Sequence, residues 1–264
     1  MAGGYHSKGW QRFAYDPRTA AWAAHARVAG RAALTDPAFA EWLQCEGTWF
    51  IGVDALPNDS SGQLADGPAL AGPAIDFIRT EHGDLGDLHR AQVSAMFPGY
   101  PRPRIGEGDA AFRYRLNRDA AHVDGIKLFG ADRRRRIEEP HAWVLGLPLN
   151  AASPDAAPLV VWEGSHHIMR AAFQGLLQDV PPEQWAQVDV TETYTEARRK
   201  VFDTCPRVTV HAQPGEAYLM HRLCLHGVAP WGDGAKAPDG EGRMIAYFRP
   251  EMSDWQRHWL SATR

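Results

Sequence analysis

The chain has 264 residues, of which 44% are hydrophobic and 23% are charged, and its formal net charge is -4. These values are ordinary for a globular protein with one large core or at most two domains. The negative balance disfavours a general nucleic-acid binder, which needs a broad basic surface. No segment approaches the apolar length that crosses a bilayer, so we expect no membrane span.

The three cysteines, Cys45, Cys205 and Cys224, show no paired spacing. They cannot all be bridged with one another, and reduced thiols are the simplest interpretation. We therefore expect a cytoplasmic protein.

The first third of the chain is predicted to be mainly helical. Two Asp-Pro pairs, at 16–17 and 36–37, each place a capping residue before a proline at the first helical position. They predict helices that run to about residue 33 and over residues 38–44. The later segments of this third are predicted as a strand at 48–53, a loop at 58–67, and helices at 69–79 and 85–96.

Beyond a Pro/Gly-rich stretch at 97–108 the pattern changes to short β segments. Residues 112–116 alternate apolar and basic side chains, as a half-buried strand does. Further strands are predicted at 141–149, 159–162, 208–212, 217–220 and 244–248. A polar helical insert at 167–203 separates two groups of these strands.

Several short strands separated by turns are typical of a sandwich or jelly roll, here closed by an N-terminal helical layer. No linker-like stretch isolates two cores. We therefore predict one domain over residues 1–264, mainly β with helices, in which 1–110 is mainly helical support and 111–250 is the core.

The most informative residues are His122, Asp124 and His226. Side chains two apart on a strand point to the same side, so His122 and Asp124 can enter one cavity while Val123 packs behind them. His226 must then arrive from another strand. Two histidines and one carboxylate leave coordination positions open, which is typical of non-haem Fe(II) oxygenases. The alternative is that Asp124-Gly125 is a simple turn and His122 a surface residue.

Three later segments extend this pattern: Pro-Leu-Val-Val-Trp-Glu-Gly-Ser-His at 158–166, Pro-Gly-Glu-Ala-Tyr-Leu-Met-His through His-Gly at 214–227, and an arginine that opens a strand at 243. With the His-x-Asp, these motifs in this order resemble the phytanoyl-CoA dioxygenase-like family of Fe(II)/2-oxoglutarate oxygenases over about residues 110–250. The chain departs from the family pattern at Glu163, where proline is usual, and at Val228, where serine or threonine is common.

The resemblance implies a double-stranded β-helix (jelly-roll) core in which His122, Asp124 and His226 hold Fe(II). It implies that Arg243 pairs with the distal carboxylate of 2-oxoglutarate, because the planar guanidinium donates two parallel hydrogen bonds and stays charged. It also implies that O2 and 2-oxoglutarate are consumed, with release of succinate and CO2, while a small molecule is hydroxylated. Related halogenases carry Ala or Gly in place of Asp124, so this chain is interpreted as a hydroxylase, although desaturation would use the same site.

The position of the co-substrate anchor leaves an alternative. The 17 residues from His226 to Arg243 are more than is usual in the family, and residues 232–242 look like an inserted loop that absorbs the difference. If they do not, Arg249 is the competing anchor. Asn117, on the strand predicted before the metal ligands, is a further candidate for co-substrate binding.

Several residues near these motifs have plainer interpretations. His221 and Cys224 are interpreted as packing residues and not as ligands, and the pair at 166–167 as a turn and helix start. The four arginines at 133–136 are interpreted as a solvated run balanced by nearby glutamates. Their alternative is an anion grip at the mouth of the pocket.

Two other functions stay open at this point. The chain could be a non-catalytic sensor that binds iron or 2-oxoglutarate, or a zinc hydrolase that uses the same three ligands. No His-Glu-x-x-His motif is present, and a hydrolase would not need Arg243. The expected partner is a small-molecule substrate whose identity the sequence does not indicate, and the oligomeric state is equally unspecified.

Overall fold

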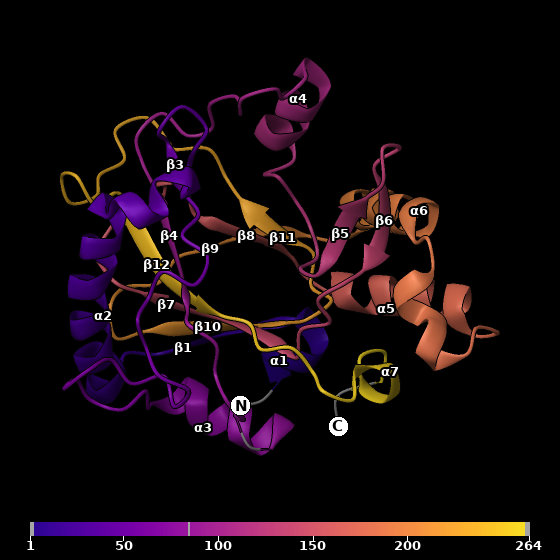
Figure 1. The fold of residues 1–264 in the computed structure, drawn as a ribbon, viewed down its shortest axis with the longest axis horizontal. Helices are drawn as coiled ribbons and strands as arrows, with labels where there is room; N and C mark the ends of the chain where they lie inside the picture. The colour runs from indigo at the N-terminus through magenta and orange to yellow at the C-terminus, as the bar shows by residue number, and fades with distance from the viewer. Residues whose placement is uncertain (1–2, 84, 262–264) are drawn as a thin grey trace.

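The protein, described here by a computed structural model over residues 3–83 and 85–261, is built on two antiparallel β-sheets (Figure 1). The larger sheet has the strand order β1-β10-β7-β12-β4-β3-β2. Its strands are β1 (Trp10–Phe13), β2 (Leu43–Gln44), β3 (Trp49–Phe50), β4 (Gln92–Met96), β7 (Trp143–Pro148), β10 (Ala217–His221) and β12 (Arg243–Phe248).

The smaller sheet has the order β11-β8-β9, with β8 at Leu159–Trp162, β9 at Arg207–Val210 and β11 at His226–Val228. An isolated antiparallel bridge between His122 and His226 adds one more position beside β11. From β7 to β12 the chain passes back and forth between the sheets, because β7, β10 and β12 belong to the larger sheet, and β8, β9 and β11 belong to the smaller one. This is the strand path of a jelly roll, so the predicted fold class is confirmed.

The sequence of β7 shows why the larger sheet is buried on both faces. Val144 packs between the two sheets with Val161, Tyr218 and Ile245. Leu145 and its alternate neighbours instead face the helical layer, because successive side chains of a strand point to opposite faces. Both faces are apolar, and the strand reads as a nearly continuous hydrophobic run.

Helices cover the outer faces of both sheets. On the larger sheet lie α2 (Pro17–Thr35), η1 (Pro37–Trp42) and α3 (Pro73–His82), and α2 begins as predicted, with the Asp16 side chain accepting a hydrogen bond from the Arg18 amide. On the smaller sheet pack α5 (Ser165–Leu177), η2 (Pro182–Gln187) and α6 (Thr191–Thr204), which match the predicted insert. In Figure 1 the two groups lie on opposite sides of the strands.

The remaining elements are α1 (Gly3–Lys8), α4 (Asp109–Asn117), β5 (Ile126–Phe129), β6 (Arg134–Ile137) and α7 (Trp255–His258). The strands β5 and β6 form a separate two-stranded sheet. Within the described residues, no helix combines the length and apolar character needed to cross a membrane.

Two predicted elements have the wrong type. No helix forms in the segment predicted as one at 85–96, and its residues 92–96 instead form strand β4, in which polar Gln92 and Ser94 alternate with apolar Val93 and Ala95. Residues 112–116, predicted as a strand, belong to helix α4. A stretch of five alternating residues is too short to distinguish the two-residue period of a strand from the 3.6-residue period of a helix. In α4 only Arg115 is buried, so the helix has no apolar face that would have indicated it.

Other differences concern boundaries. The segment predicted as a helix at 38–44 is a 3-10 helix that ends at Trp42 and then pairs as β2, and the strand predicted at 48–53 is confined to β3. The helix predicted at 69–79 starts later, at Pro73. Because β1 and β4 join the larger sheet, the jelly roll also extends into the first 110 residues, which were predicted to be mainly helical support.

A group of buried histidines lies where the N-terminal segment meets the sheet. The Tyr5 hydroxyl contacts His82 at 3.1 Å, and the rings of His166 and His221 lie 4.9 Å apart. Burial lowers the pKa of His82 and of His166 to about 4. These histidines are therefore neutral in the folded protein at pH 7.

We predict that the protein becomes less stable as the pH falls from 7 to 5. In that range the unfolded chain takes up a proton at His166 that the folded chain does not, so the free energy of unfolding falls by about 2 kcal/mol for this residue. Urea unfolding at both pH values measures the loss. His166→Gln should reduce the pH dependence, whereas the exposed control His25→Gln should leave it unchanged; equal slopes for both variants would contradict the prediction.

Candidate metal centre

Backbone pairing brings the two candidate histidine ligands together. His122 donates its amide to the His226 carbonyl at 2.8 Å, and His226 donates back to the His122 carbonyl at 3.0 Å. Residues that pair in this way carry their side chains on the same face of the sheet. The two imidazole rings accordingly lie with their centroids 4.6 Å apart.

The carboxylate comes from a turn and not from a regular strand. Asp124 and Gly125 form the turn that was the alternative interpretation, yet Asp124 faces the same side as His122. Gly125 has φ +79°, and a side chain there would overlap the carbonyl oxygen of Glu139. Glycine therefore permits the close turn that brings Asp124 back toward the histidines.

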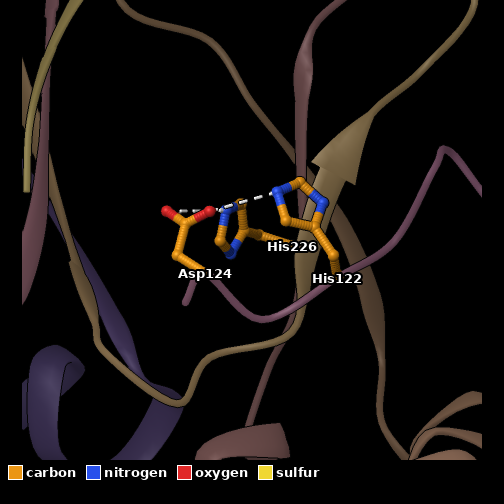
Figure 2. Close-up of side chains that lie close together, drawn as sticks. All are labelled: His122, Asp124 and His226. Carbon is orange, nitrogen blue, oxygen red and sulfur yellow. Dashed lines mark ion pairs between the residues drawn. The ribbon is translucent and has the colours of Figure 1, made fainter. Parts of the chain in front are cut away.

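Figure 2 shows the three side chains pointing toward one another from their two segments. Asp124 Oδ1 lies 3.2 Å from His122 Nε2, and Oδ2 lies 3.7 Å from His226 Nε2. One ligand atom from each residue lies within 4.8 Å of the others. These distances suit three ligands around one divalent cation.

Hydrogen bonds fix which imidazole nitrogen is free. His122 Nδ1 lies 3.0 Å from the Ala120 carbonyl, and His226 Nδ1 lies 2.9 Å from the Cys224 carbonyl. A carbonyl oxygen only accepts, so each Nδ1 carries the proton and each Nε2 keeps its lone pair. This is the usual support of a metal-binding histidine, and the residues present fit a metal ion.

The charges at the centre also fit a cation. Burial opposes ionisation of Asp124, but the Arg249 guanidinium beside it favours the carboxylate, and the pKa of this carboxyl lies well below its usual range. Burial lowers the pKa of His226 to about 4. At neutral pH the centre therefore offers a carboxylate and a neutral buried imidazole, the protonation states that a metal requires.

A cavity of about 180 Å³ opens beside the three side chains, between the two sheets. Its wall mixes apolar and polar groups contributed by β3, β4, β7, β8, β11 and β12. Besides the three candidate ligands it is lined by Trp49, Ile51, Gln92, Ser94, Val144, Leu159, Gly227, Val228, Tyr247 and Arg249. Such a pocket has room for a small chelating molecule next to a metal.

Sequence analysis missed the polar residues that β3 and β4 contribute to this cavity. Trp49 donates its indole N–H to the Ser94 hydroxyl at 3.2 Å, and Gln92 lies two residues before Ser94 on the same face. The alternation of polar and apolar residues over 92–96 was the signal that could have found them. It was lost because the segment was interpreted as a helix.

The two candidate arginines occupy different places, because Arg243 is the first residue of β12 and Arg249 directly follows the last residue of that strand. Arg249 lines the cavity, and its Nη1 lies 3.6 Å from Asp124 Oδ1. Arg243, at the other end of the strand, is buried beside Tyr218, and its Nε has no hydrogen-bond partner. The Tyr218 hydroxyl in turn bonds that of Tyr247, which lines the cavity, at 2.7 Å.

Asn117 does not join the centre. It is the last residue of α4, its side chain is exposed, and it lines neither of the cavities that include His122. Its prediction as a co-substrate contact is therefore corrected. The error follows from interpreting α4 as a strand that leads straight into the metal ligands.

The other residues near the motifs pack as expected. His221 Nδ1 accepts a hydrogen bond from the Leu223 amide, and its ring faces His166 in the histidine group. Cys224 is fully buried between the sheets, and burial raises the pKa of its thiol to about 12. His166 lies in the first turn of α5. None of these side chains belongs to the metal centre.

No protein-family model matches the chain, and no curated protein sequence matches it. The crystal structure of EvdMO1 is similar with a TM-score of 0.46 and 14% identity, over 93% of this chain and 48% of EvdMO1, so the chain spans about half the length of that protein. The structure of SnoK, a non-haem α-ketoglutarate-dependent carbocyclase from nogalamycin biosynthesis, is similar with a TM-score of 0.42 and 11% identity, over 94% of this chain and 81% of SnoK.

EctD from S. alaskensis with bound Fe is also similar, with a TM-score of 0.44 and 15% identity over 94% of this chain and 75% of EctD. The same protein has been solved with 2-oxoglutarate and 5-hydroxyectoine, and that structure gives a TM-score of 0.40. At such low identity the function of this chain has to be argued from its own residues.

We predict that His226→Ala weakens binding of a divalent metal by more than about 100-fold, because removal of a ligand should cost more than removal of its supporting hydrogen bond. The backbone bridge to His122 does not need the imidazole, so circular dichroism should show a retained fold. Anaerobic calorimetric titration with Fe(II), or with Co(II) as a stable substitute, measures the affinity. The exposed His25→Ala is the matched control, and equal affinity in both variants would rule out the centre.

Proposed function

We propose that the chain is an Fe(II)- and 2-oxoglutarate-dependent dioxygenase that hydroxylates a small molecule and releases succinate and CO2. The observation that carries the proposal is the convergence of His122, Asp124 and His226 at the edge of a cavity. Three ligands on one side leave the other coordination positions of an iron open for a chelating keto acid and for O2. The bound iron would supply the oxidation chemistry, and the protein positions the molecules around it.

The buried arginine on β12 supports 2-oxoglutarate as the co-substrate. A guanidinium held 7% exposed with a free Nε is costly unless an acceptor reaches it, and a carboxylate is the acceptor that its planar donors fit best. Arg243 would hold the distal carboxylate of the keto acid, with the Tyr218 and Tyr247 hydroxyls beside it. The keto acid would then extend through the cavity past Val228 toward the metal.

Arg249 has a different role in this proposal. Its guanidinium lies 3.6 Å from Asp124 Oδ1, the oxygen that also faces His122, so it favours the ionised carboxylate and restrains its orientation. Asp124 also bears on the outcome of the reaction, since a carboxylate in this place occupies the position that a halide would need. The proposal is therefore hydroxylation.

Uncoupled turnover tests the activity without knowledge of the prime substrate. The purified protein with Fe(II), O2 and 2-oxoglutarate should release succinate, and His122→Ala should abolish the release. A protein that binds Fe(II) and 2-oxoglutarate without any succinate release would be the sensor. Activation by Zn(II) of ester or amide cleavage, with no consumption of 2-oxoglutarate, would identify the hydrolase.

We predict that Arg243→Gln raises the apparent KM for 2-oxoglutarate by about 10- to 100-fold, because two charge-assisted hydrogen bonds to the carboxylate are lost. Arg249→Gln, directly after the end of β12, is the matched comparison and should change this KM by less than about threefold, since the contact of Arg249 is to Asp124. Succinate release at varied 2-oxoglutarate measures both. The reverse order of effects would assign the anchor to Arg249.

A further inference from the structure

A second cavity lies against the metal centre, on the side of His122. It has a volume of about 500 Å³ and shares Trp49 and His122 with the first cavity. The His122 side chain is 48% exposed, so the centre is open on this side. The walls come from the segment before α4, from α4 itself, from β6 and from α6.

Three arginines in this wall form no ion pair with any other described residue, although the backbone amide of Arg104 donates to Glu107. In the described part of the chain, no carboxylate lies within ion-pairing distance of the guanidinium groups of Arg104, Arg135 and Arg198, which we call the arginine cluster. Their neighbour Arg115 differs, because it is paired with Glu107. Within the cluster, the Nε atoms of Arg104 and Arg198 are also buried and without a hydrogen-bond partner.

Aromatic rings hold the arginine cluster in place. The guanidinium of Arg104 lies 4.9 Å from the ring centroid of Trp49, and those of Arg135 and Arg198 lie 5.5 and 4.6 Å from that of Tyr194. Cation–π contacts of this kind orient a guanidinium without satisfying its N–H donors. Arg135 Nη1 donates to the Ile126 carbonyl and Arg198 Nη1 to the Tyr114 hydroxyl, and the Nε donors of Arg104 and Arg198 have no partner within the described residues.

Tyr194 and a second tyrosine, Tyr114, are hydrogen-bonded to the segment that carries His122 and Asp124. The Tyr194 hydroxyl accepts a hydrogen bond from the Val123 amide at 2.9 Å, and the Tyr114 hydroxyl donates to the Ala121 carbonyl at 2.8 Å. Arg198 Nη1 donates to the Tyr114 hydroxyl at 2.9 Å. Arg135 and Arg198, the two members of the arginine cluster that lie over Tyr194, are thus held close to the segment that carries His122.

The charge distribution around the centre is uneven. Burial, together with the nearby Arg198 cation, lowers the pKa of Arg135. A different cavity, reached past Arg249, is lined by four carboxylates, those of Asp54, Asp87, Glu139 and Glu251. That cavity would repel an anion, whereas the cavity beside His122 attracts one.

We propose that the arginine cluster binds the anionic group, a phosphate or a carboxylate, of the molecule that is oxidised. Three guanidinium groups with free donors match an oxyanion, for which arginine is the preferred partner. The rest of the molecule would lie against Trp49 and reach the metal on the open His122 side. This inference rests on the proposed function for the identity of the reaction but not for the binding of the anion.

The first experiment measures anion binding alone. Metal-free protein is titrated calorimetrically with inorganic phosphate and, separately, with acetate, at low and high salt. We expect binding of at least one anion, weakened by salt because exposed charges are screened. Arg198→Gln should weaken it by at least about tenfold, and Arg198→Lys by less, since lysine keeps the charge but not the planar donors.

The control is Arg199→Gln, which removes the same charge from the next residue of α6, where the side chain is exposed. It should bind the anion as the unaltered protein does. Arg104→Gln, in the loop before α4, gives a second test that does not depend on the folding of α6. Equal anion affinity of Arg198→Gln, Arg104→Gln and the unaltered protein would overturn the proposal. It would also be overturned if neither phosphate nor acetate bound to the unaltered protein.

The second experiment uses the protein loaded with Fe(II) and 2-oxoglutarate. The rate of succinate release is measured in the presence of each member of matched pairs of small molecules. Each pair consists of an alcohol and its phosphate ester, or of an amide and the corresponding carboxylic acid. Anionic members should stimulate release more than neutral ones, and Arg198→Gln should raise the concentration they require by about tenfold. Stronger stimulation by the neutral members would overturn the proposal, whereas anion binding without any succinate release would instead contradict the proposed function.

Discussion

The reciprocal pair of backbone hydrogen bonds between His122 and His226 is the constraint on which the candidate site depends. It joins the segment after α4 to β11, two parts of the chain that only the jelly-roll topology brings together. Direct pairing forces both imidazoles to one face, and the turn at Gly125 then brings the carboxylate to them. Gly227 completes the arrangement, because any side chain there would overlap the Asp119 carbonyl oxygen. The geometry of the three ligands is thus set by the main chain.

Much of this centre could be predicted from the sequence, because its features are local. The i, i+2 spacing of His122 and Asp124 and the strand-forming residues around 226 and 243 are visible in short windows, and strands such as β8 were predicted with their observed bounds. The resemblance to a known family supplied the pairing of distant segments. Spacing alone does not show which strands meet.

The errors arose where tertiary contacts override local preference. The segment of β4 is compatible with a helix, and it becomes a strand because it is inserted between β3 and β12 and buried. The segment of α4 alternates like a strand, but Arg115 finds Glu107 and Cys45 in the helical conformation. The misreading of α4 also misplaced Asn117. The polar wall of the first cavity was not predicted either, because Gln92 and Ser94 belong to β4, the segment predicted as a helix.

The hydroxyl of Tyr194 has a consequence for how the two halves of the site communicate. It accepts a hydrogen bond from the amide of Val123, the residue between two candidate metal ligands, while Arg135 and Arg198 lie over its ring. An adjustment of those cations around a bound anion would act on the backbone between His122 and Asp124 through this one ring. By thermodynamic reciprocity, whatever factor the anion imposes on metal affinity, the metal imposes on anion affinity. The order in which the two arrive would then change the path of assembly but not the strength of the final complex.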